Sequence, residues 1–140
     1  MTTILIIDDM VQTLKFLSLY LSKDGFGVKT ARNFQEGWEV LEKEKIDLIL
    51  LDVMMPGING YETCKRLKKD ERFVNIPVVF VTSCDSGEAI SQCFDAGGVD
   101  YVYKFAAQRE LLARIKTQLQ LSANQDSEKK SNDALFESVG

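Results

Sequence analysis

The chain has 140 residues, is 45% apolar and carries a formal net charge of −4, which suits one domain with its own core and argues against a general nucleic-acid binder. It contains no histidine, so histidine-based catalysis and histidine-ligated metal sites are excluded. No apolar run approaches the ~20 residues that span a bilayer, so membrane insertion is not expected.

The first half of the chain alternates strand and helix patterns. An apolar run predicts a strand at about 3–7, and leucines at 3,4-spacing predict a helix at about 10–23. A short strand at about 27–30 follows. Asn33, with Glu36 three residues later, forms an approximate capping box that introduces the second helix.

The second half of the chain repeats this alternation. Strands are expected at about 48–51, 78–81 and 101–103, and helices at about 61–69, 88–95 and 108–121. Five strand–helix units predict an α/β fold, a doubly wound five-stranded parallel sheet with helices on both faces. The flavodoxin-like strand order 2-1-3-4-5 is the natural arrangement.

The composition changes at residue 122. Residues 122–140 are rich in Ser, Asn, Asp, Glu and Lys, and they bury too little apolar surface to offset the entropy of ordering. We therefore predict one domain over residues 1–121 and a polar, flexible tail over residues 122–140, which begins as a frayed extension of the last helix.

Polar side chains stand directly after four of the predicted strands. They are Asp8 and Asp9, Asp52, Thr82, and Lys104. Because parallel strands with crossover helices end at one edge of the sheet, these groups should converge there. Clustered carboxylates favour a divalent cation, and one of them can attack phosphorus as a nucleophile. A hydroxyl and an ammonium group suit the phosphoryl oxygens, so the sequence predicts a site for a cation and a phosphoryl group.

In this order, these residues strongly resemble the receiver domain of two-component response regulators. The motifs that carry the resemblance are IIDD at 6–9, LLDVMMPGING at 50–60, VT at 81–82 and DYVYK at 100–104. The resemblance covers roughly residues 3–121. It implies a signalling phosphoacceptor rather than an enzyme, a protein that assists only its own phosphorylation and dephosphorylation.

The resemblance also implies roles for individual residues. Asp52 would accept the phosphoryl group from a phosphohistidine of a sensor histidine kinase or a histidine phosphotransfer protein. Mg²⁺, or Mn²⁺, would be held by Asp9, Asp8, Asp52 and the backbone carbonyl of Met54.

The remaining roles implied by the resemblance concern switching. Thr82 would shift toward the phosphoryl oxygens, Tyr101 would turn inward after it, and Lys104 would form an ion pair with a phosphoryl oxygen. The switched surface would contact a downstream protein target and not nucleic acid directly.

The chain departs from the family pattern after Lys104. Phe105 stands where the family has a proline whose preceding bond is typically cis. A cis bond before a non-proline residue costs ~2.5–4 kcal/mol, so a trans bond and an altered output surface are expected. Ala106 replaces a common aromatic residue. Met54 and Cys84 would flank the pocket as apolar groups, which predicts slow hydrolysis of the phosphoryl group.

Two other functional classes stay open from the sequence. A degenerate receiver would act as an interaction module that is never phosphorylated, and the residue after Lys104 is the feature that favours it. A phosphatase of the haloacid dehalogenase type would need a second aspartate two residues after the nucleophile, where Met54 stands, and a cap domain.

The cysteines and the first residues of the chain indicate the cellular compartment. Cys64, Cys84 and Cys93 form no CxxC pair, and the first residues lack the positive charges of a secretory signal. Reduced thiols in a cytoplasmic protein are therefore expected.

Overall fold

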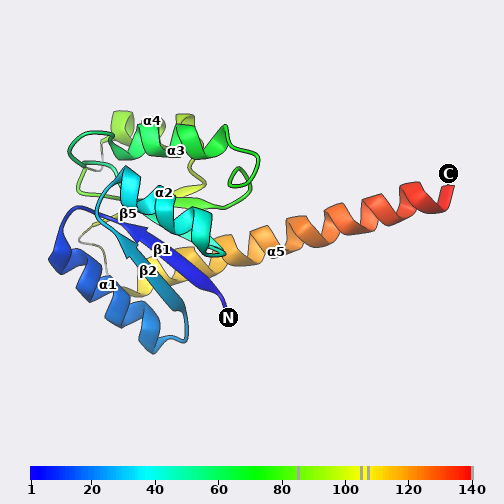
Figure 1. Cartoon of the computed structure of the whole chain (residues 1–140), viewed down its shortest axis with the longest axis horizontal. Helices are drawn as coiled ribbons and strands as arrows, with labels where there is room; N and C mark the ends of the chain where they lie inside the picture. Colours follow the sequence, from blue (N-terminus) through cyan, green and yellow to red (C-terminus); the bar gives the residue numbers. More distant parts are fainter. Residues whose placement is uncertain (85, 105, 107, 140) are drawn as a thin grey trace.

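A parallel sheet in the strand order β2-β1-β3-β4-β5 forms the centre of the computed structural model (Figure 1). The structure describes residues 1–84, 86–104, 106 and 108–139, and from residue 125 onward it describes the backbone alone. The strands are β1 (Thr3–Ile7), β2 (Gly27–Ala31), β3 (Leu48–Asp52), β4 (Val78–Thr82) and β5 (Asp100–Tyr103). The helices are α1 (Val11–Lys23), α2 (Phe34–Lys43), α3 (Gly60–Lys68), α4 (Gly87–Asp95) and α5 (Gln108–Val139). The predicted fold class and strand order are confirmed.

Alternating side chains of the central strands enter two separate cores. Ile49 and Leu51 of β3 belong to one core, whereas Leu48 and Leu50 belong to the other. Every residue of β3 and β4 is buried, as expected for parallel strands that are covered on both faces. The continuous apolar runs in the sequence are the direct result of this double burial.

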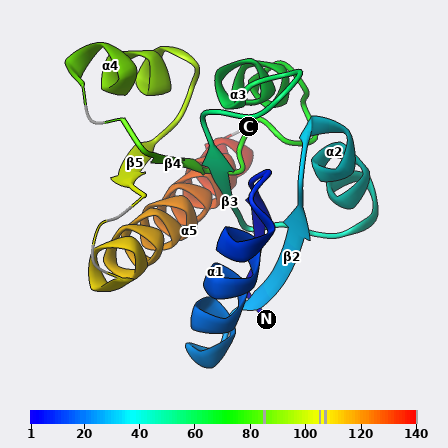
Figure 2. The same cartoon turned by 90° about the vertical axis from the view of Figure 1, so that its left-hand side faces the viewer.

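Helices cover both faces of the sheet (Figure 2). Buried side chains of α1 and α5, such as Leu17 and Ile115, pack on one face, and those of α2, α3 and α4, such as Leu41 and Cys93, pack on the other. With helices on both faces, the ends of the strands stay open at one edge of the sheet. The site predicted from the sequence lies at this edge.

The start of α2 shows how local sequence places a helix. The side chain of Asn33 accepts a hydrogen bond of 2.9 Å from the backbone N–H of Glu36. The Glu36 carboxylate in turn accepts from the N–H of Arg32, at 3.0 Å, one residue before the position of an ideal capping box. The predicted helix start is therefore confirmed, with a slightly shifted reciprocal bond.

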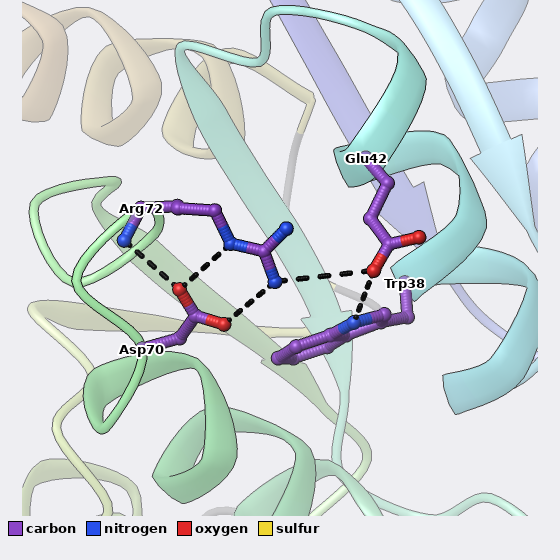
Figure 3. A network of polar contacts seen from close by, with 4 residues as sticks. All are labelled: Trp38, Glu42, Asp70 and Arg72. Carbon is purple, nitrogen blue, oxygen red and sulfur yellow. Dashed lines mark hydrogen bonds and ion pairs between the residues drawn. The ribbon is translucent and has the colours of Figure 1, made fainter.

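A polar network joins α2 to the connection between α3 and β4 (Figure 3). The indole N–H of Trp38 donates to the Glu42 carboxylate at 3.0 Å, and Arg72 lies 3.9 Å from the same carboxylate oxygen. Arg72 also pairs with Asp70 at 2.9 Å, while the Trp38 ring meets Phe73 edge-on with centroids 5.2 Å apart. Trp38 therefore reports on the packing between α2 and this connection.

Helix α5 is longer than predicted. The expected end at about Leu121 is wrong, because the helix continues to Val139. Residues 122–139 contain neither Gly nor Pro, so nothing in the sequence breaks the backbone hydrogen bonds of the helix. Whether residues 122–140 behave as a separate flexible tail stays a prediction.

Other boundaries differ by one to a few residues. Asp52 and Thr82 are the last residues of β3 and β4, not the first residues after them. The bond between Lys104 and Phe105 lies outside the described residues, so its predicted trans form stays a prediction. Among the described helices, none is long and apolar enough to cross a bilayer.

Candidate functional site

Three carboxylates meet where β1 and β3 end. Oxygen atoms of Asp8, Asp9 and Asp52 all lie within 4.8 Å of one another. Hard carboxylate oxygens are the donors that Mg²⁺ prefers, and that ion commonly keeps several waters between itself and the protein. The donor set therefore fits a divalent cation, held directly or through water.

Lys104 brings a positive charge to the same place. Its backbone N–H donates to the carbonyl of Thr82 at 2.6 Å, which fixes the chain beside the end of β4. Its ammonium Nζ lies 3.2 Å from Oδ2 of Asp8 and 3.9 Å from Oδ2 of Asp52. The side chain is only 12% exposed, so this cation is held inside the site.

The three aspartates differ in their surroundings. Asp8 is buried and accepts a hydrogen bond of 2.8 Å from the N–H of Met10. Asp52 is also buried, and its Oδ1 accepts from the N–H of Met54 at 3.3 Å. Asp9 is exposed. The structure thus places one carboxylate against the lysine, one at the centre and one toward solvent.

The surroundings of Asp52 raise the pKa of its carboxyl group to about 7. Burial is the main cause, the neighbouring charge of Asp8 adds to it, and the ammonium of Lys104 opposes both. A cation bound among these carboxylates would offset this repulsion and favour the ionised form of Asp52. Positive charge near Asp52, such as the ammonium of Lys104, therefore favours the ionised form of this carboxylate.

The hydroxyl of Thr82 is buried and engaged with its own loop. Its Oγ1 accepts a hydrogen bond of 3.0 Å from the N–H of Cys84 and donates to the Cys84 carbonyl at 3.1 Å. In the paired strands β3 and β4, the residue opposite Asp52 is Val81, which directly precedes Thr82. The Thr82 hydroxyl would have to leave these bonds to reach a group on Asp52.

Gly60 packs closely against the backbone of Asp52. A Cβ at this position would collide with the carbonyl oxygen of Asp52, and the N–H of Gly60 donates to the carbonyl of Val53 at 2.9 Å. Asn59 caps the same helix by accepting from the N–H of Glu62 at 2.9 Å. The sequence showed this glycine within a motif but did not reveal its contact with Asp52.

Tyr101 lies in β5 between two helices. Its ring meets Phe94 of α4 edge-on at 6.1 Å, and the guanidinium of Arg114 in α5 lies 6.0 Å from the ring centroid. Arg114 also donates to the Asp100 carboxylate at 2.9 Å. The predicted switch residue is thus placed where α4, β5 and α5 meet.

A cavity of about 500 Å³ opens beside the site, and sequence reasoning missed it. Asp9, Asp52 and Lys104 line its polar end. Its apolar wall includes Phe16 and Leu17 of α1, Val102 of β5, Leu111 of α5, and Ala106 in the connection between β5 and α5. The side chain of Met54 also lines it and is 71% exposed.

Comparisons with known proteins agree with this geometry. Residues 4–116 match the family model described as the response regulator receiver domain. The chain is 38% identical over 126 residues, 90% of its length, to the phosphate regulon transcriptional regulatory protein PhoB of Pseudomonas aeruginosa. It is 41% identical over 128 residues, 89% of its length, to the transcriptional regulatory protein CpxR homolog of Haemophilus influenzae. It spans 55% and 53% of these two relatives.

Solved structures show the same likeness. A CheY-like response regulator receiver domain protein of Methanospirillum hungatei superposes with a TM-score of 0.82 at 28% identity, over 89% of this chain and 98% of that one. The BeF3-activated N-terminal receiver domain of Klebsiella pneumoniae RstA gives a TM-score of 0.78 at 30% identity, over 84% and 98%.

Proposed function

Because the chain belongs to the response regulator receiver domain family, we propose that it accepts a phosphoryl group on Asp52 and thereby switches a surface that contacts other proteins. The observation that carries this proposal is the position of the Lys104 ammonium, 3.2 Å from Asp8 and 3.9 Å from Asp52, beside a cluster of three carboxylates. The donor would be a phosphohistidine of a sensor histidine kinase or a histidine phosphotransfer protein.

The transfer would proceed by attack of a carboxylate oxygen of Asp52 on phosphorus. The new O–P bond forms as the P–N bond to the donor imidazole breaks, and the imidazole leaves with the bonding electrons. Lys104 would pair with a phosphoryl oxygen, and the position of its ammonium 3.2 Å from Asp8 and 3.9 Å from Asp52 supports this role. Thr82 would exchange its bonds to Cys84 for a phosphoryl oxygen.

Mg²⁺ or Mn²⁺ is the proposed cofactor. Asp8, Asp9 and Asp52 would hold it, with the backbone carbonyl of Met54 as a further ligand. When bound, it supplies positive charge to the carboxylates and to the phosphoryl oxygens. The raised pKa of Asp52 supports this requirement, since near neutral pH the central carboxylate needs positive charge nearby to stay ionised.

The cavity gives the donor a place to bind. It opens directly onto Asp52 and has an apolar wall, so an apolar helix face that carries the phosphohistidine would cover it. Phe16 on this side of α1 is 52% exposed although it is aromatic. The burial of such surface would contribute to affinity for the donor protein.

The switch would work through Tyr101 and the elements around it. A phosphoryl group that draws Thr82 inward leaves space beside β4, and the ring of Tyr101 would move toward it from its position against Phe94. We propose that α4, β5 and α5 then present an altered surface to a downstream protein target. We propose no direct contact with nucleic acid and no enzymatic turnover of other molecules. We also propose that the protein is located in the cytoplasm.

Small-molecule phosphorylation tests the proposal. Wild-type protein incubated with phosphoramidate and Mg²⁺ should gain the mass of one phosphoryl group, and chelation of the metal should prevent the gain. Asp52→Asn should abolish it, whereas Asp95→Asn, an exposed aspartate in α4, should leave it unchanged.

The outcomes distinguish the alternative functions. A wild-type protein that gains no mass would support a receiver that acts only as an interaction module. Turnover of a generic phosphate ester would support a phosphatase instead.

A further inference from the structure

A methionine side chain reaches the ammonium group at the centre of the site. Met10 follows Asp9 and directly precedes α1, and its Sδ lies 3.4 Å from Nζ of Lys104. The side chain is 50% exposed and lines the cavity. Asp8, Asp52 and the thioether of Met10 therefore surround the same ammonium. Peroxide in the solvent can reach this residue.

Oxidation would change the chemical character of this contact. A thioether sulfur is a weak hydrogen-bond acceptor, whereas a sulfoxide oxygen is strongly polar. A sulfur lone pair of Met10 attacks one oxygen of hydrogen peroxide, the O–O bond breaks and water is released. Sulfur is oxidised by two electrons to the sulfoxide, and peroxide is reduced. The added oxygen then lies within reach of the Lys104 ammonium.

We propose that Met10 is an oxidation site that regulates phosphorylation, because its sulfoxide binds the Lys104 ammonium and keeps it from the phosphoryl group on Asp52. This inference rests on the proposed function of Asp52. Lys104 is only 12% exposed, so few waters compete with a strong acceptor beside it. Among the described contacts of the Lys104 ammonium, Met10 supplies the only sulfur.

The test uses peroxide, a matched methionine variant and two measurements. Wild type, Met10→Leu and Met54→Leu are each treated with hydrogen peroxide and then with dithiothreitol, which reduces disulfides and sulfenic acids of cysteine but not methionine sulfoxide. Peptide mass spectrometry locates the sulfoxide. The NMR signal of the Lys104 amino group and the rate of phosphorylation by phosphoramidate are recorded for each protein before and after treatment.

The expected result is specific to one residue. Oxidised wild type and oxidised Met54→Leu should show a shifted Lys104 signal. Their phosphorylation rate should fall by at least about tenfold, which is the effect expected when one hydrogen bond to a charged group is lost. Met10→Leu should show neither change relative to its own untreated sample. A methionine sulfoxide reductase should restore wild type.

Several outcomes would overturn the inference. They are an equal loss in Met10→Leu, full recovery with dithiothreitol alone, or a sulfoxide at Met10 without a shift of the Lys104 signal. The NMR measurement needs no phosphorylation. An untreated protein that never gains a phosphoryl group would therefore count against the proposed function, while the Lys104 signal would still decide whether the sulfoxide binds the ammonium.

Discussion

Replacement of Asp52 by asparagine should stabilise the metal-free protein at alkaline pH. In the folded protein, burial and the charge of Asp8 raise the pKa of Asp52 to about 7 from the ordinary value of 3.8. The folded state therefore binds this proton more tightly than the unfolded state does. Wild type has the full benefit below the ordinary pKa of 3.8 and loses it progressively as the pH rises from there through about 7. An asparagine side chain is nearly the same size, carries no charge, and offers a carbonyl that can still accept from the N–H of Met54.

The size of the effect follows from the pKa difference. A rise of about three pKa units corresponds to ~4 kcal/mol in the free energy of unfolding, and this is an upper value. Water enters the site from the cavity and side chains relax, so we expect Asp52→Asn to be more stable than wild type by about 2 kcal/mol at pH 8. The difference should disappear toward pH 4. It should also shrink when Mg²⁺ is added, because the cation stabilises only wild type.

Urea unfolding followed by Trp38 fluorescence at several pH values, with a chelator present, measures this difference. Asp9→Asn is the matched control, since it removes a charge from the same cluster at an exposed position, and its effect should be smaller. An equal gain in stability at pH 5 and pH 8 would contradict a raised pKa of Asp52 in the folded protein. A lower stability of Asp52→Asn than of wild type at pH 8 would also contradict it.

Three further substitutions test the site. Lys104→Met should lower the free energy of unfolding by about 3 kcal/mol at pH 8, because it leaves buried Asp8 without its cation; a neutral result in urea unfolding would contradict the pairing. Gly60→Ala should cost about 2 kcal/mol and slow phosphorylation, because its Cβ would push against the carbonyl of Asp52; wild-type values of both would refute that contact. Met54→Asn should shorten the phosphoryl lifetime, because a polar side chain at the mouth of the site can position the attacking water; an unchanged rate of phosphate loss would argue against this role.

Most of the fold could be predicted because it depends on patterns that repeat along the chain. The runs at β3 and β4 are apolar at every position before the final polar residue since both sheet faces are covered, and this made them visible. The convergence of Asp8, Asp52 and Lys104 followed from the rule that parallel strands end at one edge. The family resemblance then gave each of them an expected role.

The rest could not be predicted because it depends on contacts between segments far apart in the sequence. The sulfur of Met10 meets the ammonium of Lys104 although the two residues are 94 positions apart in the sequence. The collision that excludes a side chain at Gly60 depends on how the loop after β3 folds back on Asp52. Helix α5 continues well beyond Leu121, because the polar residues that follow include no Gly or Pro to break it, and polarity alone does not mark the end of a helix.

As one continuous helix, α5 would act as a lever on the domain. The helix is held to the sheet by Leu111 and Ile115 and then runs on past the body of the molecule (Figure 1). Leu119 also packs on the core, and Ser122 lines a pocket with residues of the domain body, so the free part runs from 123 to 139. At ~1.5 Å per residue this part is about 26 Å long, so a tilt of about 10° at its packed end would move its far end by about 4 Å. A displacement too small to alter the core would thus become a large movement at a distance from Lys104, the residue whose loop leads into this helix.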